Sequence, residues 1–221
     1  MEKIKAREKE KVDLQNQIAT TELKALRAQM NPHFIFNAIN SVQYFMTSND
    51  PQSSQKYLSK FARLIRYVLD NSKPGAIPLG NEIDALKLYM DLEALRFGGR
   101  FTYTVLITEN IDLNYVQIPS MLIQPYVENA IWHGIMHKKG DGKITISITM
   151  KDAVLTCIVE DNGIGRLKSK EMKSSESLAY HSIGMSVTKE RIELISKLNN
   201  IKPRVNIFDL YETKPLSTAS R

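Results

Sequence analysis

A short polar cluster lies in an otherwise apolar segment near the middle of the chain. Pro125 suits the first turn of a helix, and Asn129 and His133 are spaced one helical turn apart, with Glu128 beside Asn129. An amide oxygen can bind Mg²⁺, a carboxylate can accept a proton or position water, and an imidazole can contact phosphate. The intervening residues are expected to face the core: Val127, Ala130, Ile131 and Gly134. The cluster is therefore either a phosphate-handling site or a plain polar surface.

A second candidate is the run EDNGIG at residues 160–165, which comes directly after an apolar strand pattern. Asp161 at the end of a strand can accept a hydrogen bond from an amino group such as that of adenine. Gly163 and Gly165 permit backbone geometry that a side chain would block. The same residues are also typical of an ordinary turn after a strand, so this pattern alone leaves both interpretations open.

A third candidate is the glycine that opens the last helical pattern. Gly184 and Met185 follow a polar segment at residues 169–182 and precede a run with helical apolar spacing that extends to Ile195. Backbone N–H groups at the start of a helix can meet a phosphate, and the loop before them can act as a lid. The chain therefore carries three separate pieces suited to binding a nucleotide.

His33 is the candidate nucleophile upstream of these pieces. It follows Asn31 and Pro32, which interrupt a helical pattern of apolar residues and predict a kink or a restart of the helix. A neutral imidazole is a competent nucleophile near neutral pH. A single histidine between Pro32 and Phe34 is, by itself, more typical of a packed or capping residue.

In this order and at these spacings, the three downstream pieces resemble the ATP-binding domain shared by histidine kinases, gyrase-type ATPases and related heat-shock chaperones. The resemblance runs from about residue 77 to residue 210. It implies that Asn129 holds Mg²⁺ and that Asp161 reads the adenine of ATP. It also implies that the nucleotide pocket is shaped by Gly163, Gly165 and Gly184 and includes Met185. The residues implied to lie near the phosphates are His133, Gly134, Lys138 and Lys139.

Two longer stretches resemble one kinase family more closely. LRAQMNPHFIFNAINSV, residues 26–42, resembles the phosphoacceptor box of the LytS-like sensor histidine kinases. IPSMLIQPYVENAIWHG, residues 118–134, resembles the nucleotide-binding helix of the same family. The resemblance implies that His33 accepts the γ-phosphoryl group of ATP·Mg²⁺ and passes it to an aspartate of a response regulator. Glu128 is then the candidate for helping to remove the proton of His33.

The chain divides into four parts by composition and periodicity. Residues 1–22 are rich in Glu, Lys, Gln, Ala and Leu and predict a helical, coiled-coil-like connector. Residues 23–72 predict two amphipathic helices that dimerise and carry the phosphoacceptor, joined by a turn at residues 47–52, with Ser53 or Ser54 as the cap of the second helix. Residues 73–80 predict a linker rich in Pro and Gly, and residues 81–221 predict the ATP-binding domain.

The elements of the last part predict an α/β sandwich with a mixed sheet, so the whole chain is expected to be an α+β protein. Asn81 is expected to cap a helix that stops at Gly98 and Gly99. Residues 101–107 alternate as a strand, residues 144–150 and 154–159 as a hairpin, and residues 205–210 as a further strand. The upstream helical hairpin is too small to bury both apolar faces, so we expect a homodimeric four-helix bundle.

The composition is that of an ordinary globular protein, with 221 residues, 43% hydrophobic residues and 24% charged residues. The single cysteine, Cys157, excludes an internal disulfide framework, and we expect it to be a small buried core residue. The formal charge of +6 comes from interspersed residues and gives little support to a nucleic-acid partner.

No apolar stretch is long enough to cross a bilayer, and the charged start of the chain is not followed by the apolar core of a signal peptide. With the resemblance, this predicts the cytoplasmic portion of a bacterial membrane receptor, trimmed at both ends. Its contact with the membrane would be through a sensor segment upstream.

Three function classes compete on the sequence. The first is a sensor histidine kinase that phosphorylates itself. The second is a non-catalytic ATP-binding interaction module of the same fold, which would bind ATP and Mg²⁺ and leave His33 unmodified. The third is an ATP-hydrolysing machine of the gyrase or chaperone type, which would turn over ATP independently of His33.

Overall fold

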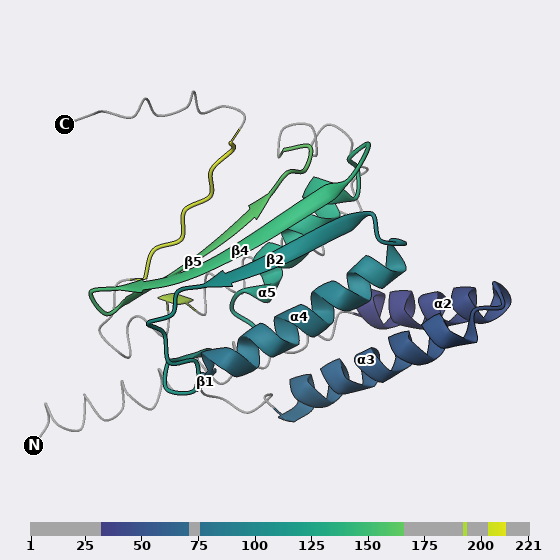
Figure 1. Cartoon of the computed structure of the whole chain (residues 1–221), viewed down its shortest axis with the longest axis horizontal. Helices are drawn as coiled ribbons and strands as arrows, with labels where there is room; N and C mark the ends of the chain where they lie inside the picture. Colours follow the sequence, from purple (N-terminus) through teal and green to yellow (C-terminus); the bar gives the residue numbers. More distant parts are fainter. Residues whose placement is uncertain (1–31, 71–75, 166–191, 194–202, 211–221) are drawn as a thin grey trace, which may run out of the picture.

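The computed structural model describes residues 32–70, 76–165, 192–193 and 203–210. The expected connector at residues 1–22 lies outside the described residues, as do Gly184 and Met185. Within the described part, a helical hairpin comes first and a mixed sheet covered by helices follows (Figure 1). The chain is therefore an α+β protein, as predicted.

The hairpin consists of α2 (Pro32–Thr47) and α3 (Pro51–Asp70). The expected cap at Ser53 or Ser54 is wrong, because α3 begins earlier and the Asp50 carboxylate accepts the backbone N–H of Ser53 at 3.0 Å. Asp50 is the first suitable side chain before Pro51, a residue that fits the first turn of a helix because it needs no N–H partner. The rings of Phe45 and Tyr57, 5.9 Å apart between centroids, pack the two helices together.

Helix α4 (Leu79–Arg96) begins before the expected cap at Asn81, so that prediction is wrong. Among the described residues, no side chain caps this helix. Instead the N–H groups of Leu79 and Gly80 donate to the carbonyl oxygens of Val116 and Leu113, at 2.8 and 2.9 Å. A loop distant in sequence therefore satisfies the first turn. The predicted stop is confirmed, because Gly98 and Gly99 have φ angles of +60° and +75°, which favour glycine.

The main sheet has the strand order β2-β4-β5, with β2 (Phe101–Ile107), β4 (Gly142–Lys151) and β5 (Val154–Asp161). Strand β2 is parallel to β4, and β5 is antiparallel to β4, which confirms a mixed sheet and the predicted hairpin. Asp152 and Ala153 make the hairpin turn with φ angles of +50° and +60°. Positive φ at both central residues is the geometry of a tight hairpin turn that matches the twist of the strands.

A second, two-stranded sheet lies at the start of α4. It pairs β1 (Ala76–Pro78) antiparallel with β3 (Gln117–Pro119), and Ile77 opposite Ile118 is buried. Strand β1 falls within the predicted linker. Both strands are too short for a periodic pattern, so this pairing could not be predicted from the sequence.

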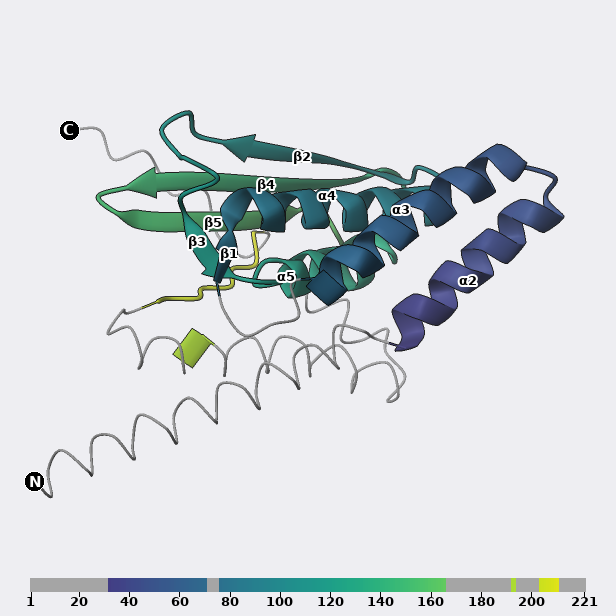
Figure 2. The same cartoon turned by 90° about the horizontal axis from the view of Figure 1, so that it is seen from below.

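Helix α4 and the segment formed by α5 (Gln124–Asn129) and η1 (Ala130–Ile135) cover one face of the main sheet (Figure 2). The centre of this face is the row of β4 side chains Ile144, Ile146 and Ile148, each at most 1% exposed. Helix α3 lies along the other side of α4, and its buried side chains belong to the same core. Helix α4 is therefore the layer between the hairpin and the sheet.

Two further expectations are corrected. Cys157 is exposed rather than buried, because β5 has β4 as its only paired neighbour among the described strands and lies at the edge of the sheet. Residues 203–210 are extended but join no sheet in the described part of the chain, and Phe208 is 71% exposed. The apolar alternation there lacks a partner strand. Of the helices described, none combines the length and apolar character needed to cross a membrane.

Candidate nucleotide-binding and phosphoacceptor site

The predicted polar helix is present, but its second half is wider than an α-helix. Helix α5 begins with Pro125 in its first turn and continues as the π-helix η1. The N–H of Met136 donates to the carbonyl oxygen of Ile131 at 2.8 Å, five residues back. Val127, Ala130, Ile131 and Gly134 are buried, as predicted. Single turns of π-helix inside longer helices are frequent at functional sites.

Glu128 lies on α5 with its carboxylate held inside the protein. Its Oε1 accepts a hydrogen bond from the Gln124 side chain at 2.9 Å. Burial raises the pKa of Glu128 to about 7, while the hydrogen bond from Gln124 opposes part of this shift. A carboxylate with a pKa near neutrality can both accept and release a proton at physiological pH. This geometry suits Glu128 to proton transfer better than to binding a metal.

Asn129 and His133 are half-buried on the same continuous helical segment, at the end of α5 and within η1. The turn after η1 carries the two candidate phosphate lysines. Lys138 is half-buried and its ammonium donates to the carbonyl oxygen of Asp141 at 3.0 Å, whereas Lys139 is exposed. The positive charge of Lys138 acts on Asp161. The lysine turn therefore lies within electrostatic range of the second motif.

The structure brings the second motif directly against the first. The carbonyl oxygen of Gly134 accepts the N–H of Ile164 at 3.0 Å, and the Asp161 carboxylate accepts the N–H of Gly163 at 2.8 Å. A methyl group added to Gly163 would lie 2.2 Å from the Cα of Gly134, and one added to Gly134 would lie 2.4 Å from Asp161 Oδ1. Both glycines are thus required by the close approach of two backbones, and not by an unusual φ angle.

Asp161 is the last residue of β5, which confirms its predicted place at the end of a strand. Burial raises its pKa, the hydrogen bond from Gly163 opposes this, and the carboxylates of Glu160 and Asp209 add to it. Gly165 follows with a φ angle of +80°, which favours glycine. Asn162 joins this loop to β4, because its Oδ1 accepts the N–H of Lys143 at 2.7 Å. The end of β5 is therefore fixed on both sides.

The residues present fit a magnesium ion that is bound mainly through phosphates. Within the described segments, no group of three or more His, Cys, Asp or Glu side chains is placed to hold a metal. Mg²⁺ keeps several waters and is commonly held by one or two protein oxygens together with substrate phosphates. The half-buried amide of Asn129 supplies one such oxygen.

Two acidic residues of α4 take part in the site, and the sequence reasoning missed both. Glu82 is 2% exposed, and its carboxylate accepts the backbone N–H groups of Met121 and Ile123 at 2.6 and 3.2 Å. Met121 has a φ angle of +55°, which is uncommon for a residue with a side chain. Glu82 therefore fixes the turn that leads into α5.

Glu93 is the second buried acid. It is 1% exposed, its Oε1 accepts a hydrogen bond from Arg96 at 3.2 Å, and its Oε2 has no hydrogen-bond partner in the described part of the chain. Burial raises the pKa of Glu93 to about 7, with Arg96 opposing and Glu128 adding to the shift. The Arg96 guanidinium lies 4.5 Å from the ring centroid of Phe97 and 4.4 Å from that of Trp132. These contacts join the end of α4 to η1.

A sequence signal for both acids existed. Glu82, Leu86, Tyr89 and Glu93 are spaced by four, three and four residues, so they lie on one face of α4. The other two residues of this face are buried. Acidic residues within an apolar helical stripe are rarely buried without a partner, so this pattern predicts local hydrogen bonding.

His33 lies in the first turn of α2. The ring of the next residue, Phe34, packs against Phe61 of α3 at 5.9 Å and against Tyr89 of α4 at 5.6 Å between centroids. Tyr89 in turn interacts with Trp132 of η1 and with the charge of Glu128. The turn that contains His33 is therefore connected through packed side chains to the helix that carries Asn129.

Comparison with known proteins places this chain among histidine kinases. A family model described as histidine kinase matches residues 21–101, which include His33, the hairpin and α4. The sensor histidine kinase YpdA of Escherichia coli (strain K12) is 34% identical over 175 residues. The sensor protein LytS of Bacillus subtilis (strain 168) is 37% identical over 146 residues. The sensor histidine kinase/phosphatase LytS of Staphylococcus aureus (strain Mu50 / ATCC 700699) is 32% identical over 176 residues.

These alignments cover much of this chain and a small part of each relative. They include 79%, 65% and 78% of this chain, in the order given, but 30%, 24% and 29% of the relatives. The chain therefore spans less than a third of the length of the curated relatives it matches.

Proposed function

Because this chain belongs to the LytS-like family of sensor histidine kinases, we propose that it transfers the γ-phosphoryl group of ATP to His33. The observation that carries the proposal is the junction of Gly134, Asp161 and Gly163, where two separate nucleotide motifs meet in backbone contact. His33 lies at the start of α2, next to Phe34, whose ring contacts Tyr89 of α4, and this position supports the choice of acceptor.

In the proposed site, Asp161 accepts a hydrogen bond from the adenine amino group and the glycines leave room for the nucleotide. The family resemblance assigns Gly184 and Met185, which lie outside the described residues, to the same pocket. His133, Lys138 and Lys139 face the phosphates, where lysine acts as a point charge. Asn129, together with the phosphates, would hold Mg²⁺, and the ion would supply neutralisation of negative charge on the transferring group.

The transfer breaks the bond between the γ-phosphorus and the bridging oxygen, which leaves with ADP. An imidazole nitrogen of His33 supplies the electron pair of the new N–P bond. The other ring nitrogen then loses its proton, and Glu128 accepts it. A carboxylate with a pKa of about 7 can hold this proton and return it to solvent. The phosphoryl group afterwards passes from His33 to an aspartate of a response regulator.

We place the hairpin in a homodimeric four-helix bundle. Phe36, Ile39 and Met46 follow helical spacing along α2 and are 65%, 54% and 67% exposed. Leu58 and Leu69 of α3 are 53% and 55% exposed. Apolar surface of this extent on two paired helices is typical of an interface, and a second copy of the hairpin supplies a matching surface. The whole receptor would present this part to the bacterial cytoplasm, with its sensor segment in the membrane.

The test is self-labelling with γ-labelled ATP and Mg²⁺, with His33→Gln beside the wild type. We expect label on the wild type and none on the variant, at equal affinity for ATP. Binding of ATP without label would favour a non-catalytic interaction module. Steady ATP hydrolysis that is independent of His33 would favour a machine of the gyrase or chaperone type.

A further inference from the structure

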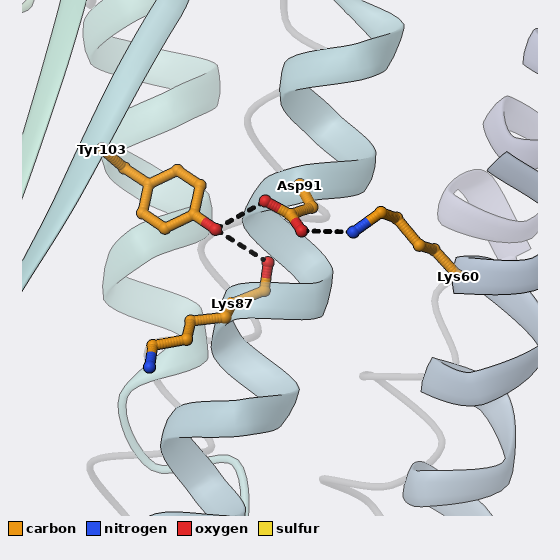
Figure 3. A network of polar contacts seen from close by, with 4 residues as sticks. All are labelled: Lys60, Lys87, Asp91 and Tyr103. Carbon is orange, nitrogen blue, oxygen red and sulfur yellow. Dashed lines mark hydrogen bonds and ion pairs between the residues drawn. The ribbon is translucent and has the colours of Figure 1, made fainter. Parts of the chain in front are cut away.

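One carboxylate joins three elements where the helical hairpin meets the sheet. Asp91 lies on α4, and its Oδ1 accepts a hydrogen bond from the Tyr103 hydroxyl of β2 at 2.5 Å. Its Oδ2 pairs with the Lys60 ammonium of α3, also at 2.5 Å. Figure 3 shows Asp91 between these side chains, with the Tyr103 hydroxyl 3.4 Å from the carbonyl oxygen of Lys87. One oxygen therefore faces the sheet and the other faces the hairpin.

The environment keeps Asp91 ionised. Partial burial alone would raise the pKa of Asp91, but hydrogen bonds from Lys60 and Tyr103, with the charges of Lys60 and Lys56, outweigh it and lower the pKa. The side chains of Lys60 and Asp91 are 23% and 35% exposed, so solvent screens the pair and its contribution to folding free energy is small. We therefore expect the Lys60–Asp91 pair to affect the position of α3 on α4 more than the free energy of unfolding.

The remaining contact between the hairpin and α4 is mainly apolar. Tyr57, Leu64 and Val68 of α3 are buried in one core with the inner face of α4. Burial of apolar surface is favourable but has no preferred direction. An ion pair with a defined partner and orientation can therefore select one register of α3 on α4 from several with similar burial.

This register also sets the position of the phosphoacceptor. The ring of Phe34 contacts Phe61 of α3 and Tyr89 of α4, so the first turn of α2 is packed between these helices. His33 precedes Phe34 in that turn. A shift of α3 along α4 therefore moves the backbone of His33 relative to the nucleotide-binding helix.

We propose that Asp91 is a positioning residue for phosphoryl transfer, which with Lys60 and Tyr103 fixes the register of the hairpin on α4 and thereby the place of His33 relative to the nucleotide. The inference rests on the proposed kinase function. A misplacement of about 1 Å can lower a rate about 100-fold. Loss of the register therefore lowers the rate of transfer and leaves ATP binding unchanged.

The first test measures the rate of self-labelling at saturating ATP, together with ATP affinity. Asp91→Asn keeps the size of the side chain and removes the charge that holds Lys60. We expect the rate of self-labelling to fall by about tenfold or more, while the affinity for ATP stays unchanged. Lys60→Arg should retain most of the rate, and Arg63→Gln removes an exposed charge from the same helix as a control. An Asp91→Asn rate equal to or above that of the wild type would overturn the proposal.

The second test measures the register directly and needs no phosphoryl transfer. Spin labels on Ser59→Cys of α3 and Thr104→Cys of β2, both exposed sites, report the distance between hairpin and sheet in a Cys157→Ser background. We expect Asp91→Asn to shift or broaden the distance distribution. An unchanged distribution would exclude a positioning role. Absence of phosphoryl label on the wild-type protein in the first test would instead count against the kinase function. The distance between the spin labels would still decide the register.

Discussion

Asp161 terminates β5 at the point where the two nucleotide motifs meet. Its Oδ1 accepts the N–H of Gly163 and lies where a side chain on Gly134 would have to go. The carboxylate is therefore held in place by backbone, and this leaves its second oxygen for a ligand. In the proposed function that ligand is the adenine amino group.

Asp161→Asn tests this role with little change in size. A hydrogen bond to a charged group contributes roughly 1.5–3 kcal/mol, so we expect the affinity for ATP to fall about 10- to 100-fold in a calorimetric titration. Glu160→Gln, at the exposed neighbouring position, is the matched control and should bind ATP as the wild type does. Wild-type affinity in Asp161→Asn would remove this residue from the pocket.

Glu93 predicts a pH dependence of stability. Its pKa is about 7 in the folded protein against 4.5 for an unperturbed glutamate, because burial favours the neutral form. The folded state therefore binds more protons between these values. The stability contributed by protonated Glu93 is fully present below pH 4.5 and is lost as the pH rises through 7.

Glu93→Gln removes this titration. Between pH 4.5 and 8, the free energy of unfolding should fall less in the variant than in the wild type, and the difference should be on the order of 2 to 3 kcal/mol. Thermal unfolding measures this. Glu128 titrates in the same direction, so part of the dependence remains in the variant. Glu109→Gln, an exposed glutamate, serves as the control. An identical pH profile for Glu93→Gln and the wild type would contradict the assignment.

At the scale of elements, the site depends on how closely η1 approaches the loop after β5. Alanine at Gly163 places its Cβ 2.2 Å from the Gly134 backbone, and backbone cannot rotate away. We expect Gly163→Ala to lower the free energy of unfolding by about 1–3 kcal/mol and to weaken ATP binding. Chemical denaturation measures the first effect and calorimetry the second.

The control for this substitution is another glycine in an ordinary environment. Alanine at Gly80, near the start of α4, meets Leu113 at 3.4 Å. Because alanine favours helix over glycine, Gly80→Ala should leave stability unchanged or raise it slightly. Equal stability of Gly163→Ala and the wild type would show that the two motifs are not in contact.

Elements with a long periodic pattern could be predicted from the sequence, and elements created by tertiary contact could not. The α3 stripe and the alternation of residues 101–107 and 154–159 depend on local spacing, so they were recognised. The start of α4 was missed because its first N–H groups bond to the distant loop near Val116. The π-helical turn and the β1–β3 pair carry no local signal either.

The motif residues of the candidate site could be predicted from the sequence, but the buried acids that hold them in place could not. Asn129, Asp161 and Gly163 follow from motif and order, and the structure brings the second motif onto Gly134, next to the helix of the first. The buried acids that hold this arrangement, Glu82 and Glu93, were missed. The partners of Glu82 are backbone N–H groups of a distant turn, whereas Arg96 pairs with Glu93 within α4. Hydrogen bonds as distant as those of Glu82 require the fold to be known.

At the scale of the whole molecule, the apolar face of the hairpin predicts self-association. Ile39→Glu places a charge in the exposed apolar row of α2 and should convert the dimer to a monomer, measured by light scattering after size exclusion. Gln52→Glu adds the same charge at an exposed polar position of α3, about a third of a turn away from Leu58 and Leu69, and should leave the dimer intact. A dimer of unchanged stability in Ile39→Glu would place the interface elsewhere.

The central claim is that His33 receives phosphate from ATP, and mapping the modified residue tests it most directly. After incubation with ATP·Mg²⁺, the tryptic peptide of residues 28–56, which contains His33 as its only histidine, is analysed by mass spectrometry. We predict one added phosphoryl group on His33 that is lost in acid and retained in base, as expected for an N–P bond. A phosphoryl group that survives acid, or a peptide that remains unmodified while ATP is bound, would contradict the account.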